Sequence, residues 1–167
     1  NPDVQLLFVL RSLLHAPPDT RVVWNSNLWL TEEALELLSG IVWLYVPDLK
    51  YGPCSCDFAL CKVGGTFPRI VSLLDRLRDA GQRVLVRHLL LPGHSQCCTM
   101  PVVRTLADRW PGLRVNLMSA YRPFALRGTG GSMASRLEKE ELLSTLALAR
   151  EEAEGKLDLR LDGLRID

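Results

Sequence analysis

The feature that most constrains the fold is the segment Ile41–Lys50, an apolar run that ends in a carboxylate and an amine two residues apart. A run rich in isoleucine, valine and leucine without strict alternation is typical of a strand buried on both faces, as in parallel sheets. Because side chains at positions i and i+2 of a strand point to the same side, we expect Asp48 and Lys50 to project together. The carboxyl ends of parallel strands are where α/β proteins build their sites. The pair is therefore a functional candidate, and a salt bridge at the rim of the sheet is the alternative.

Helical and strand patterns alternate along the chain. Strands are expected at residues 21–27, 41–50, 83–93 and 113–121, with helices at 3–15, 31–39, 67–81, 99–110 and 135–154. A Gly-rich loop, Arg127–Ser132, precedes the last helix, and the alternating segment 156–162 is either an edge strand or a strand that closes over the helix layer. This order predicts an α/β fold with a parallel sheet and right-handed crossovers. A doubly wound sheet and an open or incomplete barrel are both compatible, but four central strands are too few for a closed eight-stranded barrel.

Composition narrows the class of protein. The chain has 167 residues, 47% of them hydrophobic, which is enough for one domain with a substantial core. A net charge of +1 gives no reason to expect a nucleic-acid or anionic-membrane surface. There is no apolar run of about 18 residues and no signal-peptide pattern at Asn1–Gln5, so we expect a cytoplasmic protein.

Polar residues collect where the predicted strands end. Hydrogen-bonding groups at the carboxyl ends of four successive strands indicate a site for a polar ligand, and the alternative is that single members only cap helices or turns. The candidates are Asn25, Ser26, Asn27, Asp48, Lys50, Arg87, Asn116 and Tyr121, with His94 in the loop after the third strand.

Arg87 makes the strongest demand, because a guanidinium inside the apolar run 83–91 needs an anionic partner. Asp48 on the neighbouring strand is one such partner, and a ligand carboxylate is another. His88 has the opposite parity and is expected to pack beneath a helix. His94 is either near the site or solvated.

The five cysteines do not form a familiar metal pattern. Cys54, Cys56 and Cys61 fall in one group, and Cys97 and Cys98 stand beside His94 in a second, but neither group has the Cys-x-x-Cys pairs common at zinc sites. We expect ordinary free thiols and no metal ligands.

Four stretches, in this order and spacing, resemble the radical S-adenosylmethionine proteins related to pyruvate formate-lyase activating enzyme. The resemblance runs from Asn1 to about Ala153, and its motifs are Val22–Asn27, Tyr45–Gly52, Val86–His94 followed by Cys97-Cys98, and Val115–Pro123. It implies a partial (β/α)6 barrel that binds S-adenosylmethionine beside a [4Fe–4S] cluster and cleaves it reductively to a 5′-deoxyadenosyl radical. It also implies an electron donor such as flavodoxin or ferredoxin, and a protein substrate activated by radical chemistry.

The resemblance assigns roles to individual residues. Asp48 and Lys50 would hold the amino and carboxylate ends of the methionine portion, and Arg87 would pair with its carboxylate. Asn25-Ser26-Asn27 matches an Asp-Thr-Asn of the activating enzyme, with Asn25 in place of the acid. Tyr121 falls where that enzyme has a histidine near the nucleoside.

One departure is large. The cluster-binding Cys-x3-Cys-x2-Cys and the Gly-Gly-Glu of the family are absent from this sequence. Without three thiolates there is no cluster to deliver an electron. We therefore interpret residues 1–155 as a partial radical S-adenosylmethionine barrel lacking its first strands, inactive by itself, with a C-terminal strand or tail at 156–167. The alternative is a non-catalytic, degenerate barrel that binds a small ligand or a protein partner. An unrelated hydrolase or phosphate binder has no support, since neither a Gly-x-Ser-x-Gly elbow nor a P-loop is present.

Overall fold

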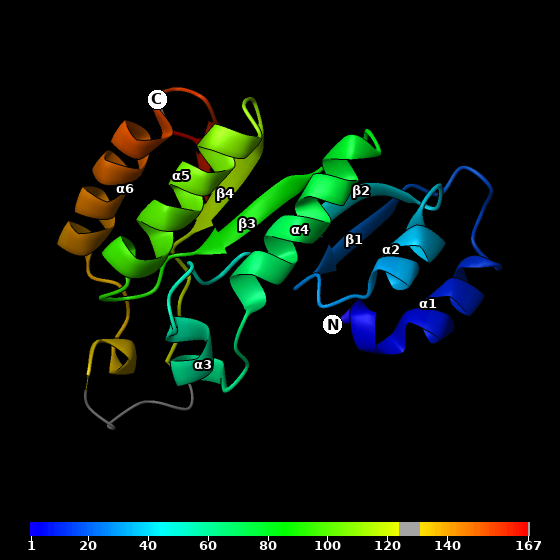
Figure 1. The fold of residues 1–167 in the computed structure, drawn as a ribbon, viewed down its shortest axis with the longest axis horizontal. Coiled ribbons are helices and arrows are strands. Elements are labelled where there is room, and N and C mark those ends of the chain that lie inside the picture. Colours follow the sequence, from blue (N-terminus) through cyan, green and yellow to red (C-terminus); the bar gives the residue numbers. More distant parts are fainter. Residues whose placement is uncertain (124–130, 167) are drawn as a thin grey trace.

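The computed structural model describes residues 1–123 and 131–166 (Figure 1). The strands are β1 (Val22–Ser26), β2 (Val42–Pro47), β3 (Leu85–Leu89), β4 (Arg114–Met118), β5 (Asp158–Leu161) and β6 (Leu164–Arg165). The α-helices are α1 (Leu6–Leu13), α2 (Glu32–Leu38), α3 (Cys56–Cys61), α4 (Thr66–Asp79), α5 (Met100–Arg109) and α6 (Lys139–Ala153). Shorter turns are the 3-10 helices η1 (Pro2–Gln5) and η3 (Ser132–Ala134) and the π-helical turn η2 (Ser95–Thr99). The expected Gly-rich loop lies, up to residue 130, outside the described residues.

The strands form two small sheets. β1 and β2 pair in parallel, and the second sheet has the order β3-β4-β5-β6, with β6 antiparallel to β5. Two isolated parallel bridges, Tyr45 with Val84 and Asp48 with Arg87, connect β2 to β3. The second bridge aligns the carboxyl ends of these two strands, and it positions the site described below.

The predicted partial (β/α)6 barrel is wrong. A barrel closes only when its first and last strands pair. In the described part of the chain, β1 pairs with β2 alone and β6 with β5 alone. The segment before β1 is helical, and the last strand is the short antiparallel arm of a hairpin. The protein is a small α/β structure with one parallel and one mixed sheet.

One face of β3 is more fully covered than the other. Val86 and His88 of β3 are completely buried, whereas Leu85, Arg87 and Leu89 are half-buried. Figure 1 shows α4 and α5 on the same side of the strands, with α6 beyond α5. The expectation that the strand at 41–50 is buried on both faces is confirmed from Tyr45 to Leu49, which are all buried, but not at Ile41 and Trp43, which are exposed. In β3, by contrast, burial alternates. Its alternating burial follows from a single helix layer.

The helix layer and the covered strand face form one apolar core. α4 contributes its inner row of side chains, α5 packs on α6, and the strands add the side chains that face the helices. Central members of this core are Tyr45, Leu74, Leu77, Val86, Val102, Val103, Leu106, Val115, Leu117 and Ala149. None of the helices formed by residues 1–123 and 131–166 has the length and apolar character needed to cross a bilayer.

The N-terminal segment is held by one carboxylate. Asp3 accepts a hydrogen bond from the indole Nε1 of Trp24 at 3.0 Å and another from the backbone N–H of Trp29 at 3.0 Å. By contrast, Phe8 on α1 is 70% exposed, and α1 has no fully buried residue. The contact with Asp3 fixes the loop that follows β1.

Candidate functional site

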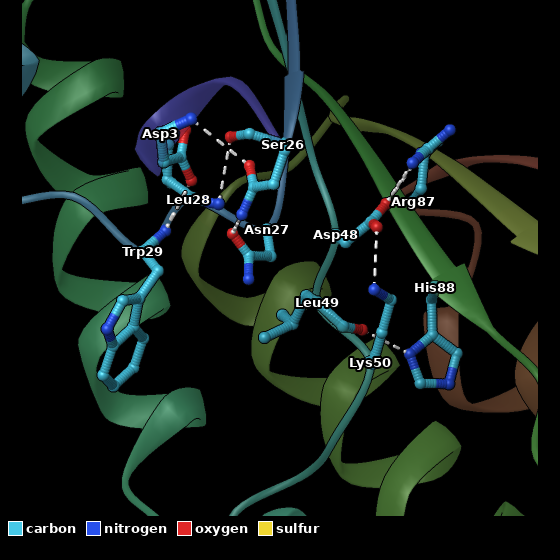
Figure 2. Close-up of polar contacts among 11 residues, drawn as sticks. Asp3, Ser26, Asn27, Leu28, Trp29, Asp48, Leu49, Lys50, Arg87 and His88 are labelled. Carbon is cyan, nitrogen blue, oxygen red and sulfur yellow. Dashed lines mark hydrogen bonds and ion pairs between the residues drawn. The ribbon is translucent and has the colours of Figure 1, made fainter. Parts of the chain in front are cut away.

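Asp48 and Arg87 are the centre of a charged cluster at the carboxyl ends of β2 and β3 (Figure 2). Because partners in a parallel bridge point to the same side, their side chains meet on one face. Arg87 donates from Nε and Nη2 to Oδ1 of Asp48, at 2.7 and 2.6 Å. Asp48 is buried and Arg87 is half-buried. Arg87 therefore has the neighbouring carboxylate as partner, which is one of the two partners that the sequence allows.

Lys50 completes the cluster. Its Nζ lies 3.0 Å from Oδ2 of Asp48, so each carboxylate oxygen faces a cation. Asp48, Lys50 and Arg87, called the charged cluster below, carry two positive charges against one negative charge. The Lys50 side chain is 37% exposed and that of Arg87 is 27% exposed. A surplus positive charge on two accessible donors suits an additional carboxylate or other anion.

A cavity of about 300 Å³ lies beside Lys50. Its polar lining includes Asn27, Asp48, Lys50 and Thr66, and Trp29 and Ile70 contribute apolar surface. Arg87 is not among its lining residues. This volume is at the small end of the range for ligand sites. The cavity therefore accommodates a small amphipathic group next to an ammonium and a carboxylate.

The three polar residues at the end of β1 have separate roles. Ser26 is buried, and its Oγ accepts a hydrogen bond from the backbone N–H of Leu28 at 3.0 Å (Figure 2). Asn27 lines the cavity and accepts from the side-chain amide of Asn1. Asn25 is exposed on β1. Only Asn27 of this group borders the cavity beside the charged cluster.

Asn116 and Tyr121 make contacts elsewhere. Asn116 is the register partner of Arg87 across β3 and β4, but its Oδ1 accepts from the backbone N–H of Gly163 at 2.8 Å. The Tyr121 hydroxyl donates to the Met133 carbonyl at 2.8 Å. Burial raises the pKa of Tyr121. Asn116 thus fixes the turn between β5 and β6, and neither residue borders the cavity beside Lys50.

His88 lies on the covered face, as its parity predicts. Nδ1 lies 2.6 Å from the Leu49 carbonyl and Nε2 lies 3.0 Å from the Thr99 hydroxyl. Because a carbonyl only accepts, Nδ1 carries the proton and Nε2 accepts from Thr99. Burial lowers the pKa of His88 to about 4, although the Leu49 hydrogen bond acts in the opposite direction. His88 is therefore a neutral structural link at neutral pH.

Four of the five cysteines gather where the loops after β2 and β3 meet. The Sγ atoms of Cys54, Cys56, Cys97 and Cys98, called the thiol cluster below, all lie within 4.8 Å of one another. Nδ1 of His94 lies 3.4 Å from Sγ of both Cys56 and Cys97. All five cysteines are free thiols. The sequence does not predict that these thiols meet. Two cysteine pairs in the loops that follow adjacent strands are the only indication of it.

Burial and mutual hydrogen bonding shift the thiol pKa values in different directions. Burial, with hydrogen bonds to Cys54 and Cys97, raises the pKa of Cys56 to about 12. Burial also raises the pKa of Cys98 above its usual value. Burial acts to raise the pKa of Cys54 as well, but hydrogen bonds from Cys56 and Cys98 outweigh it and the pKa is lowered. Cys54 therefore ionises before Cys56 and Cys98.

Comparisons with known proteins place few limits on these sites. No family model matches the chain. The chain is similar to the uncharacterized protein MJ0674 of Methanocaldococcus jannaschii, with 34% identity over 149 residues. The match covers 89% of this chain and 44% of the relative, so the chain spans less than half the length of the protein it matches. The relative's name states no activity, and the similarity assigns none to this chain.

Proposed function

We propose that this chain binds S-adenosylmethionine, as part of a radical S-adenosylmethionine enzyme related to pyruvate formate-lyase activating enzymes. The observation that carries the proposal is the meeting of Asp48, Lys50 and Arg87 at adjacent strand ends. These are the three positions to which the family resemblance assigns the methionine portion of the cofactor. Electrostatics give independent support, because a cluster with one surplus positive charge favours a ligand carboxylate.

Lys50 and Arg87 have distinct tasks in this proposal. The accessible ammonium of Lys50 borders the cavity and would donate to the ligand carboxylate. Asp48 would hold both cations in place and accept from the ligand ammonium. Trp29 would cover the apolar part of the ligand, since its ring borders the same cavity. The guanidinium of Arg87, already oriented by Asp48, would keep the carboxylate side of the site positive.

A [4Fe–4S] cluster does not fit the described residues. The sequence has no Cys-x3-Cys-x2-Cys, and the four thiols that do meet lie within 4.8 Å of one another. In a cubane each thiolate binds a different iron, which separates the sulfurs more widely than the ligands of a single ion. We therefore propose binding alone for this chain and derive no cleavage step from it. The reductive reaction, a flavodoxin or ferredoxin donor and a protein substrate are proposals for a protein that supplies the cluster.

Isothermal titration calorimetry with S-adenosylmethionine and its decarboxylated analogue tests the proposal. We expect the decarboxylated compound to bind at least tenfold more weakly, because it lacks the group that Lys50 would hold, a loss of about 1.4 kcal/mol. Lys50→Gln should weaken only the carboxylated ligand. The matched control is Lys156→Gln, which removes an ammonium that pairs with Glu154 and Asp108 instead. Equal affinity for both compounds, or no effect of Lys50→Gln, would contradict the proposal.

A second candidate function is non-catalytic binding of another small anionic ligand or of a protein partner. It is favoured by one observation, the surplus positive charge of the charged cluster, which suits other carboxylates and anions as well. The same titration distinguishes the two candidates. A simple carboxylate that binds as tightly as S-adenosylmethionine would favour the second, because the nucleoside would then contribute nothing.

A further inference from the structure

We propose that Cys54, Cys56, Cys97 and Cys98 bind one divalent metal ion, of the kind that tetrahedral thiolate sites select, with Zn²⁺ as the first choice. This inference goes beyond the proposed function, because it concerns other residues and needs no S-adenosylmethionine. The thiol cluster is a distinct set of side chains that neither the charged cluster nor its cavity explains.

The spacing of the sulfurs is that of a single-ion site. A tetrahedron with Zn–S bonds of about 2.3 Å has sulfur–sulfur edges of about 3.8 Å. In the thiol cluster, Cys54 and Cys98 are 3.7 Å apart, Cys56 and Cys97 are 3.6 Å apart, and Cys97 and Cys98 are 3.9 Å apart. Four sulfurs at these separations can surround one ion without large movement. Four thiolate ligands in a tetrahedron favour zinc over ions that prefer oxygen.

Two backbones are brought close together to make this arrangement. A Cβ atom on Gly52 would lie 2.5 Å from the Cys97 carbonyl oxygen and 3.0 Å from the Cys98 Cα. Only glycine allows the loop after β2 to approach the loop after β3 so closely. Cys97 and Cys98 lie on the π-helical turn η2. This conformation is rare in proteins, and where it occurs it is often at a functional site. The local geometry of both loops is thus unusual at the point where the thiols meet.

One further polar side chain lies beside the sulfurs, that of His94. His94 Nδ1 is within 3.4 Å of both Cys56 and Cys97. Four thiolates around a divalent ion leave two negative charges, and a proton on His94 Nδ1 would make that nitrogen a donor that stabilises such a centre. His94 is placed to act in that way, outside the four-sulfur set.

Cys61 provides an internal control. It is exposed, and its thiol donates to the Asp57 carbonyl at 2.9 Å and not to the thiol cluster. Cys56 and Cys61 lie at the two ends of helix α3, yet only Cys56 belongs to the thiol cluster. A metal site of the proposed kind must therefore involve four of the five cysteines and leave Cys61 free.

The experiment uses the reduced full chain, freed of metal and titrated with Zn²⁺ or Co²⁺. We expect one ion per chain, release of protons from the thiols on binding, and thiolate-to-Co²⁺ absorption bands. Alkylation mapped by mass spectrometry should show Zn²⁺ protecting Cys54, Cys56, Cys97 and Cys98 but not Cys61. Because this mapping uses the unmodified chain, it holds even if a variant fails to fold.

Variants then test each ligand. Serine at any of the four positions should weaken Zn²⁺ binding at least tenfold, whereas Cys61→Ser should leave it unchanged. The inference is overturned if Zn²⁺ does not bind stoichiometrically, if it protects Cys61 as well as the others, or if the four thiols form disulfides in the reduced-buffer preparation. Loss of S-adenosylmethionine binding with normal metal uptake would contradict the proposed function and leave this inference standing.

Discussion

The charged cluster lies at the carboxyl ends of β2 and β3, and the thiol cluster lies in the loops that follow the same two strands. The two clusters differ in how far their groups satisfy one another. In the charged cluster, both oxygens of Asp48 face a cation within 3.0 Å. In the thiol cluster, every sulfur has another thiol as a partner, and thiols are weak donors and acceptors. A cluster of opposite charges is stable without a ligand, whereas packed thiols gain strong bonds only when a metal binds. We therefore expect ligand removal to affect the thiol cluster far more than the charged cluster.

A buried histidine connects the two clusters. His88 contacts Leu49, which stands between Asp48 and Lys50 (Figure 2). It also contacts Thr99, which follows Cys98. Its two ring nitrogens thus bridge the chain segments that carry both sets of side chains. The contrast between the clusters can be tested by perturbing each one and the histidine between them.

The largest expected effect is that of zinc on stability. At a free Zn²⁺ concentration of about 1,000 times its dissociation constant, binding to the folded chain alone should raise the free energy of unfolding by about 4 kcal/mol. Urea unfolding of the reduced chain, with Zn²⁺ and with a chelator, measures this difference. Cys61→Ser should retain the gain and Cys98→Ser should lose it. A zinc effect of the same size in Cys98→Ser would show that the ion acts at another place.

The next effect is a loss of stability in acid that originates at His88. Its pKa is about 4 in the folded state and about 6.5 when unfolded, so the unfolded chain binds the proton first as the pH falls. The stability that neutral, buried His88 provides is therefore fully present above pH 6.5 and declines as the pH falls from there to about 4. By then the free energy of unfolding has dropped by about 3 kcal/mol.

Urea unfolding of metal-free protein across this pH range measures the slope. His88→Gln keeps a donor for Leu49 but does not titrate, so its stability should vary less with pH. His15→Gln alters an exposed histidine and serves as the control. An unchanged slope in His88→Gln would refute a neutral, buried imidazole.

Removing the carboxylate of the charged cluster should lower the free energy of unfolding by less than protonation of His88 does. Asp48→Asn leaves Arg87 and Lys50 without their counter-charge in a half-buried place, and we expect a loss of about 2 kcal/mol in urea unfolding. Asp158→Asn is the matched control, because Asp158 also pairs with two cations, Arg114 and Arg160, but is more exposed. Its loss should stay below about 1 kcal/mol. Equal losses would mean that burial does not distinguish Asp48.

The smallest effect should come from the backbone contact beside the thiols. Gly52→Ala places a methyl group against the Cys97 carbonyl and should weaken Zn²⁺ binding about tenfold, or about 1.4 kcal/mol. Gly64→Ala is the control, since its nearest neighbour is a side-chain atom at 3.9 Å. Competition titration with a zinc indicator compares the two. A weaker site in Gly64→Ala than in Gly52→Ala would disprove a role for the close approach.

A feature of the fold or of the site can be predicted from the sequence when it depends on residues that are close together in the chain or on neighbouring strands. Asp48 and Lys50 follow from the two-residue period of a strand, and Arg87 needs only the next parallel strand to align with them. Barrel closure depends on whether two distant strand edges meet, which the order of helices and strands does not encode. The position of Asn116 on a predicted strand makes it a candidate for binding a polar ligand, but its side-chain amide accepts a hydrogen bond from the turn after β5.

The thiol cluster illustrates the other limit. Cys54 and Cys98 are 44 residues apart, and they meet because two irregular loops touch at Gly52. No periodic pattern specifies such a contact, and the familiar Cys-x-x-Cys spacing is absent. Strand-borne sites can therefore be predicted from parity, whereas loop-borne sites need the tertiary structure.

The adjacent pair Arg87 and His88 also restricts how β3 can align with its neighbours. A shift of β3 by one residue would reverse the direction of every side chain on the strand. The guanidinium would then lie under the helices, away from Asp48, while the imidazole would lose Leu49 and Thr99. An unpaired buried charge is among the most destabilising changes a core can suffer. Two consecutive residues with opposite requirements thus select a single strand alignment during folding, whatever ligand the finished site binds.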